Sequence, residues 1–344
     1  QVKGEDLQIS IDIRIQQKAE QLLGKGKGVI IVMNPNTGEI IALTSHPAYD
    51  PTVFVDPDLR PERNKLFINK GKPLINRALS GTYPPGSIFK IVIAAAGLEK
   101  KKIARYTPFT CPGYKVVGRR KFNCWKKGGH GDVDVCQSLA ESCNTFFYTT
   151  GLRLGPDEIA RFARSFGLGR VSGLGLSGEK KGLIPDRRWK KTALKQTWYQ
   201  GETANYSIGQ GYITLTPIQA LGMISTIANN GNLVKPTLLK GAKPVLEKIN
   251  ISKNNIKIIK TGLADTIRRE GGTAHFAQIK GLPYSGKTGT AQASGNKKHG
   301  WFVGYAPSNK PEISFVILLE NTLRGGREAA QVARDLLKFW KSTL

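Results

Sequence analysis

Apolar positions alternate with turn signals at both ends of the chain, and these patterns predict a β-sheet. Residues 28–33 and 40–43 are two β-rich runs around a turn-forming segment, which is typical of a hairpin. Residues 301–305 and 313–320 predict two further strands. Residues 325–339 predict a helix, with apolar residues at helical spacing: Ala329, Val332, Ala333, Leu336 and Leu337. One sheet assembled from both ends of the chain, with a terminal helix, indicates an α+β fold.

The middle of the chain has a different pattern. Residues 87–228 predict mainly helices and loops, so we expect this stretch to form much of a helical subdomain. Residues 242–259 are rich in lysine and asparagine and predict an excursion on the surface. No internal repeat interrupts the sequence. We therefore expect one unit over residues 1–344, with a cleft between the sheet and the helical part.

The first candidate motif is Ser87-Ile88-Phe89-Lys90, which follows Tyr83-Pro84-Pro85-Gly86 and precedes the apolar run 91–97. Pro and Gly allow a sharp turn, and the run predicts a buried helix. Residues three apart share a helix face, so Lys90 would stand beside Ser87. Burial lowers the pKa of a lysine and makes a neutral amine available as a base for a serine nucleophile. The alternative is a helix-capping serine with a solvated lysine.

Two later motifs carry complementary chemistry. Ser142-Cys143-Asn144 offers a hydroxyl and an amide; it could also be a plain polar turn, but the aromatic run after it suggests a turn held by a buried element. Lys287-Thr288-Gly289-Thr290 lies within a predicted strand, residues 283–292. Glycine in a strand often marks the close approach of a ligand or another backbone. Alternation places Lys287 and Thr288 on opposite faces, which leaves the role of each side chain open.

These three motifs, in this order and at wide spacing, resemble the site of penicillin-binding proteins and serine β-lactamases. The resemblance covers essentially the whole chain, and several other stretches are similar to the elongation-specific class B penicillin-binding proteins. These stretches are Tyr83-Pro84-Pro85-Gly86, residues 198–203, residues 208–212 with Thr216-Pro217, and residues 301–307. The resemblance implies a transpeptidase domain over 1–344, with a mainly antiparallel five-stranded sheet, flanking helices and a helical subdomain.

The resemblance also implies roles for the motif residues. Ser87 would attack the penultimate D-alanine carbonyl of a peptidoglycan stem peptide, with Lys90 as its base. Ser142 would relay a proton, and Asn144 would bind the substrate amide. Lys287, Thr288, Gly289 and Thr290 would face the substrate's terminal carboxylate, and the N–H groups of Ser87 and Thr290 would form an oxyanion hole. β-Lactam antibiotics would acylate the same serine. A β-lactamase and a β-lactam-sensing receptor domain share these motifs and remain alternatives.

Composition adds constraints on partners and location. The net charge is +27, with 52 basic and 25 acidic side chains, but the lysines are scattered and no nucleic-acid module is recognisable, so we expect no nucleic-acid partner. Attraction to an anionic membrane or cell wall is the better explanation, and a generally lysine-rich proteome is an equal alternative. No apolar run is long enough to span a membrane. We expect a membrane anchor and an N-terminal non-catalytic region to be missing. The resemblance implies a location at the periplasmic face of the inner membrane, with a polytopic glycosyltransferase and elongation scaffold proteins as partners.

The four cysteines lie in one segment, at positions 111, 124, 136 and 143, with His130 among them. Some elongation-type relatives carry Asp, Asp, His and Cys ligands to zinc in corresponding places. The resemblance therefore implies a structural Zn²⁺ on Cys111, Cys124, His130 and Cys143, a ligand set known in structural zinc sites. Cys136 is an alternative fourth ligand, and disulfides or inert thiols are alternatives to the metal. We expect the chemistry itself to need no cofactor.

Overall fold

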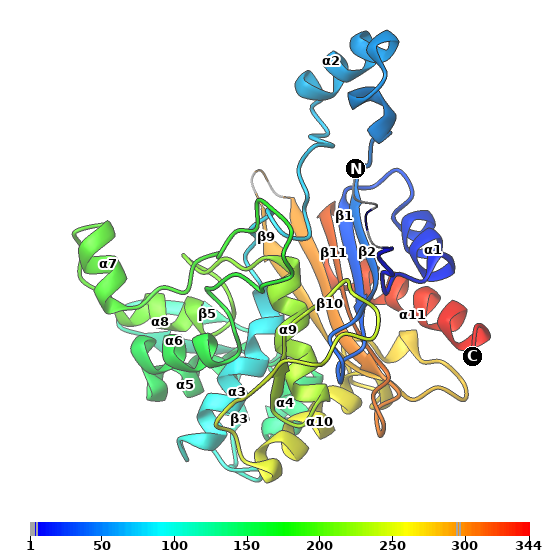
Figure 1. Cartoon of the computed structure of the whole chain (residues 1–344). Helices are drawn as coiled ribbons and strands as arrows, with labels where there is room; N and C mark the ends of the chain where they lie inside the picture. Colours follow the sequence, from blue (N-terminus) through cyan, green and yellow to red (C-terminus); the bar gives the residue numbers. More distant parts are fainter. Residues whose placement is uncertain (1–3, 5, 294, 296) are drawn as a thin grey trace.

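The computed structural model describes residue 4, residues 6–293, residue 295 and residues 297–344. Its centre is a five-stranded sheet with the order β2-β1-β11-β10-β9. Every neighbouring pair in this sheet is antiparallel. The two N-terminal strands thus lie beside the three C-terminal strands, as the patterns at the two ends of the chain predict (Figure 1). The α+β fold class is confirmed.

The strands of the central sheet are β1 (Gly28–Met33), β2 (Ile40–His46), β9 (Ser285–Gln292), β10 (Lys298–Ala306) and β11 (Ile313–Thr322). Short strands form three separate pairs: β3 (Thr110–Cys111) with β6 (Gly131–Asp132), β4 (Tyr114–Val117) with β5 (Arg120–Asn123), and β7 (Asn232–Val234) with β8 (Leu246–Lys248). The helices are α1 (Ile13–Leu23), α2 (Arg60–Ile68), α3 (Lys90–Glu99), α4 (Val135–Ala140), α5 (Asn144–Leu154), α6 (Pro156–Ser165), α7 (Arg187–Ala193), α8 (Gln200–Tyr206), α9 (Pro217–Ala228), α10 (Lys253–Arg268) and α11 (Gly326–Ser342).

Both faces of the sheet are buried, which explains why its strands are almost continuously apolar. In β1, Val29 and Ile31 face one core while Ile30 and Val32 face the other. Helices α1 and α11 cover the second face, and α9 packs against the first (Figure 1). The predicted terminal helix is confirmed, because the predicted apolar positions of α11 other than Val332 are fully buried.

Helices α3 to α9 lie within residues 90–228, separated by loops and short strands, and gather beside the sheet (Figure 1). The expected surface excursion at 242–259 is wrong in its second half. Helix α10 begins at Lys253 and buries Ile256, Ile258 and Ile259 in the first core. Local polarity concealed this helix because its lysines and asparagines occupy the solvent side of an amphipathic element.

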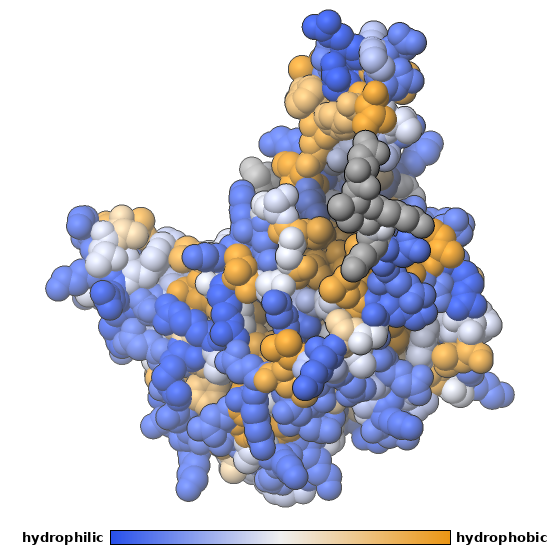
Figure 2. Space-filling view, viewed as in Figure 1, coloured by the Kyte–Doolittle hydropathy of each residue, from blue (hydrophilic) through white to orange (hydrophobic). Residues whose placement is uncertain are grey.

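Residues 51–68 form an arm that projects from the end of the sheet and carries α2 (Figure 1). Apolar side chains lie on this arm and are largely open to solvent, as Figure 2 shows. Val55 and Ile68 are each 82% exposed, and Phe67 is 65% exposed. Among helices of the described residues, none is long and apolar enough to cross a membrane.

Candidate active site

The turn that presents Ser87 is fixed by its neighbours on two sides. Gly86 has φ +55°, a left-handed conformation that favours glycine, and a Cβ there would lie 2.5 Å from Thr290 O. Its N–H donates to Gly209 O at 2.9 Å. Residues 86–89 form one 3₁₀ turn, and α3 starts directly at Lys90. Ser87 and Lys90 therefore stand one turn apart at the start of a buried helix, as the sequence predicts.

Lys90 joins the first two motifs. Its Nζ donates to Ser142 O at 2.9 Å, Ser142 Oγ at 3.0 Å and Asn144 Oδ1 at 2.6 Å. The side chain is fully buried. Burial lowers the pKa of Lys90 to about 8, although Cys143 and Cys124 oppose that shift. A neutral amine has two N–H donors and one lone pair, so it can serve the two carbonyl-type oxygens and still accept a proton from a hydroxyl.

Ser142 sits in an unusual backbone conformation at the junction of α4 and α5. Its φ is +56°, which is uncommon for any residue other than glycine and is often found at functional sites. The turn is held by the Cys143 N–H, which donates to Ser138 O at 2.9 Å, and by Trp125 Nε1, which donates to Ser142 O at 3.1 Å. The turn is therefore held in place by neighbouring segments, as the aromatic run after it suggests.

The third motif forms the opposite wall, on β9. Lys287 is fully buried, and burial together with the charge of Lys90 holds its pKa well below the usual range. Gly289 meets the nucleophile turn: a Cβ there would lie 2.9 Å from Ile88 Cγ2 and 3.0 Å from Pro85 O. The glycine thus permits close approach of another backbone.

Both threonines of this motif contact neighbouring segments. Thr288 Oγ1 donates to Thr273 Oγ1 at 2.8 Å, and Thr290 Oγ1 accepts from the Gly326 N–H at 3.0 Å. The second of these contacts ties β9 to the start of α11. Thr288 and Thr290 also face the cleft, whereas Lys287 lies behind its surface.

A cleft of about 690 Å³ brings the three motifs together. Its lining includes Ser87, Ser142 and Asn144 on the helical side and Thr288, Gly289 and Thr290 on β9. Sequence reasoning missed other residues that line it: Trp125, Glu270, Thr273, His275 and Arg327. Gln210 also lines it and belongs to the stretch 208–212 that is similar to the family. For the lining residues around 270–275, the sequence did offer a sign: the paired glycines of Gly271-Gly272-Thr273 mark a tight turn. Arg327 gave no local sign, because only the fold brings the start of α11 to β9.

The four residues predicted as metal ligands also come together, beside the second motif. The ligand atoms of Cys111, Cys124, His130 and Cys143 all lie within 4.8 Å of one another. They come from β3, the end of β5, the loop before β6 and the residue that caps α5. Hydrogen bonding with Cys143 and with His130 lowers the pKa of Cys124. Cys136 lies elsewhere, with its Sγ near Ile258 O at 3.5 Å.

The spacing of these atoms fits a tetrahedral ion. For typical Zn–S and Zn–N bond lengths, a tetrahedral edge between sulfur and nitrogen is about 3.6 Å. His130 Nδ1 lies 3.6 Å from Cys111 Sγ and 3.5 Å from Cys124 Sγ. All four cysteines are free thiols in the structure. The donor set and its geometry therefore fit Zn²⁺.

Comparisons with known proteins show the family of the chain. Residues 28–338 match the family described as "Penicillin binding protein transpeptidase domain". The chain belongs to this family. It is 36% identical over 367 residues to the peptidoglycan D,D-transpeptidase MrdA of Acinetobacter baumannii, covering 99% of this chain and 54% of that protein.

Solved structures show the same fold. Pseudomonas aeruginosa PBP2 in complex with WCK 5153 superposes with a TM-score of 0.91 at 34% identity, covering 98% of this chain and 76% of that one. The PBP2–MreC complex from Helicobacter pylori gives 0.92 at 30% identity, covering 98% and 64%. The chain spans about half the length of the curated relatives it matches.

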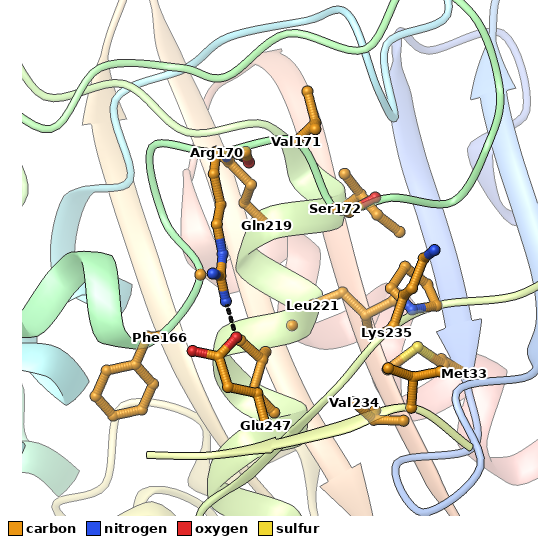
Figure 3. Close-up of a pocket in the computed structure, with 16 residues that line it drawn as sticks. Met33, Phe166, Arg170, Val171, Ser172, Gln219, Leu221, Val234, Lys235 and Glu247 are labelled. Carbon is orange, nitrogen blue, oxygen red and sulfur yellow. Dashed lines mark hydrogen bonds and ion pairs between the residues drawn. The ribbon is translucent and has the colours of Figure 1, made fainter. Parts of the chain in front are cut away.

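This transpeptidase-family domain has a second cavity, of about 280 Å³, between α9 and the β7–β8 pair. Its walls are mainly apolar, with Met33, Phe166 and Leu221 among them. Arg170 and Glu247 form an ion pair across it (Figure 3). None of the three motifs lines this cavity, so the chemistry belongs to the cleft.

Proposed function

We propose that this chain is the catalytic domain of a peptidoglycan D,D-transpeptidase that cross-links stem peptides during cell elongation. The observation that carries the proposal is the position of Lys90. It is fully buried, one turn after Ser87, and its Nζ is hydrogen-bonded to both Ser142 and Asn144. Two weak motifs far apart in sequence are thereby joined, and the third lines the same cleft, which supports one acyl-transfer site.

In the first step, Ser87 Oγ attacks the carbonyl carbon of the penultimate D-alanine and its proton passes to the neutral Lys90 amine. The C–N bond then breaks, and the departing D-alanine nitrogen receives a proton through the Ser142 hydroxyl. In the second step, an amine of a neighbouring stem attacks the ester carbon. It loses a proton to the same amine–hydroxyl pair, and Ser87 recovers its own proton. The products are a new amide and the free enzyme.

Substrate placement follows from the two walls of the cleft. The Asn144 amide is available to the substrate's peptide group on the helical side. Thr288, Thr290 and the buried Lys287 suit the terminal carboxylate on β9, and the N–H groups of Ser87 and Thr290 would hold the oxyanion. β-Lactams present a carboxylate and a reactive carbonyl, so they would acylate Ser87 in the same way.

The test is covalent labelling. The protein should form a stable 1:1 adduct with a fluorescent penicillin by intact mass, and Ser87→Ala should form none. An adduct that is hydrolysed within seconds would identify a β-lactamase instead. A stable adduct, without transfer of the acyl group of a D-alanyl-D-alanine peptide to an added amine, would favour the β-lactam-sensing receptor. Failure of the wild-type protein to react would overturn the proposal.

We further propose that Cys111, Cys124, His130 and Cys143 hold a structural Zn²⁺. Cys143 is next to both Ser142 and Asn144, so the bound ion would fix the turn to which Lys90 donates. When bound, the metal supplies rigidity, and the acyl-transfer chemistry uses the protein's own groups. Four convergent and largely buried donors support this assignment, and His130 Nδ1 lies at tetrahedral spacing from the thiols of Cys111 and Cys124.

The metal proposal has a matched control within the chain. Cys124→Ser should remove one equivalent of zinc by elemental analysis, lower the melting temperature and slow acylation. Cys136→Ser changes a buried cysteine outside the cluster and should retain the metal. Equal metal content in both variants, or purified wild-type protein that takes up no zinc, would contradict the assignment.

By the same resemblance, we propose that the domain acts at the periplasmic face of the inner membrane, joined to an anchor. There it would work with a polytopic glycosyltransferase and elongation scaffold proteins. The support for a scaffold partner is the complex of the similar Helicobacter pylori protein with MreC. Joint purification of the full-length protein with its own organism's glycosyltransferase tests this arrangement, and separation of the two under mild conditions would argue against it.

A further inference from the structure

A buried ion pair holds the segment that precedes the nucleophile turn. Arg77 Nε donates to Glu320 Oε1 at 2.9 Å, and only 4% of the Arg77 side chain and 15% of the Glu320 side chain are exposed. The same carboxylate oxygen accepts from the Tyr83 hydroxyl at 2.7 Å. Arg77 and Tyr83 belong to the segment that enters the turn, whereas Glu320 is on β11. The pair therefore fixes that segment against the central sheet.

Tyr83 leads directly to the nucleophile. Its backbone pairs with Leu215, with N–O distances of 2.8 and 2.9 Å, and its ring packs edge-on against His299 and Trp301. Trp301 Nε1 donates to Pro84 O at 3.0 Å, so the residue after Tyr83 is held from the same side. Only Pro85 and Gly86 then separate this anchored point from Ser87.

Arg77 also reaches in the opposite direction along the chain. Its two remaining guanidinium nitrogens donate to Gly71 O at 2.7 Å and Lys72 O at 3.0 Å. These carbonyls lie at the end of the segment that returns from the projecting arm of residues 51–68 (Figure 1). One side chain thus ties the base of the arm to the sheet strand that holds Tyr83.

We propose that Arg77, Glu320 and Tyr83 are positioning residues for the nucleophile: they set the place of Ser87 without touching substrate. A buried ion pair adds little net stability, because desolvation of the two charges offsets their attraction. The pair instead selects one position of the segment before Ser87 relative to strand β11. A misplacement of about 1 Å can cost about 100-fold in rate, so this arrangement matters to acyl transfer. The inference rests on the proposed function, because it assumes that Ser87 is the nucleophile.

The test compares two tyrosines that each donate one short hydrogen bond inside the protein. Tyr83→Phe removes the bond to Glu320. Tyr284→Phe removes a 2.6 Å bond to Ala277 O in the core on the opposite face of the sheet. We expect Tyr83→Phe to lower the first-order acylation constant by about 5- to 20-fold while the affinity for the penicillin before acylation stays unchanged. Tyr284→Phe should lower the melting temperature similarly and leave acylation within about twofold.

Two further measurements separate positioning from general loss of stability. Hydrogen exchange at the amides of residues 86–88 should quicken in Tyr83→Phe and not in Tyr284→Phe. Arg77→Lys keeps the charge but cannot reach three acceptors with one planar group, so it should show the same acylation defect as Tyr83→Phe. If the wild type is acylated while Tyr83→Phe and Arg77→Lys react at its rate, the positioning proposal is wrong and the proposed function stands. If the wild type is not acylated, the proposed function itself fails.

Discussion

Buried lysines in two regions of the molecule have different partners. Lys190, on α7, is 1% exposed and is paired with the Glu202 carboxylate of α8. Lys90 and Lys287, behind the cleft, are 0% exposed and bond to carbonyl, hydroxyl and amide oxygens. Among the described residues, no carboxylate forms an ion pair with either of them. A buried ammonium without a counter-charge gives up its proton easily, whereas one with a carboxylate keeps it.

The difference separates a structural lysine from a reactive one. Lys190 Nζ also lies 5.1 Å from the ring centroid of Tyr199 and 5.8 Å from that of Tyr212, within reach of cation–π attraction. Behind the cleft, the charge of Lys90 adds to burial in lowering the pKa of Lys287, since like charges repel. Burial alone therefore does not distinguish a catalytic base from a structural lysine. The distinguishing feature is the absence, within the described part of the chain, of a carboxylate partner for the buried amine.

The largest effect on acylation should come from replacing one lysine of each region, Lys90 or Lys190, by methionine, which has a similar length and no charge. Lys90→Met removes the proposed base and should slow acylation by about 100- to 10,000-fold, as loss of a general base does. Lys190→Met should stay within about threefold of the wild type. Stopped-flow measurement of penicillin acylation checks both, with melting curves to confirm folding. A comparable loss in Lys190→Met would remove the distinction between the two regions.

The next effect concerns pH. Because burial lowers the pKa of Lys90 to about 8, the neutral amine becomes more abundant as the pH rises toward that value. Acylation should therefore increase close to tenfold per unit below about pH 8 and level off above it. The Glu202→Gln variant, altered only in the structural region, should keep the same profile. A rate independent of pH between 6 and 8 would show that Lys90 is not the titrating base.

The smallest effect is on stability. Glu202→Gln leaves the buried Lys190 ammonium without its carboxylate and should lower the free energy of unfolding by about 1–3 kcal/mol; the partial exposure of Glu202 keeps the loss below that of a fully buried pair. The double variant Lys190→Met/Glu202→Gln should recover most of this loss, because no unpaired charge remains. Denaturant titration measures the cycle. Additive losses would mean that the pair does not interact.

The fold and the cleft were predictable to different extents from sequence. The hairpin at 28–43, the late strands and the terminal helix followed from local periodicity, and the structure has all of them. Helix α10 was hidden in a polar stretch, and the contribution of Arg327 to the cleft had no local signal. The apolar positions of α10 do recur at helical spacing, and only the polar composition of its other face concealed it. The place of Arg327 depends on packing between distant segments, which periodicity does not encode.

The sequence by itself determined the chemical inventory: a serine and lysine one turn apart, a hydroxyl–amide motif, a lysine–threonine strand and a segment with four cysteines and one histidine. Residue type and short spacing suffice for these, because a helical turn and a strand have fixed geometry. Only the tertiary structure decided that Lys90 bonds to Ser142, that Cys143 rather than Cys136 joins the cluster, and that Arg77 joins the base of the arm to Glu320 on β11. Those contacts join segments dozens to hundreds of residues apart, and their partners are chosen by the packing of the whole core.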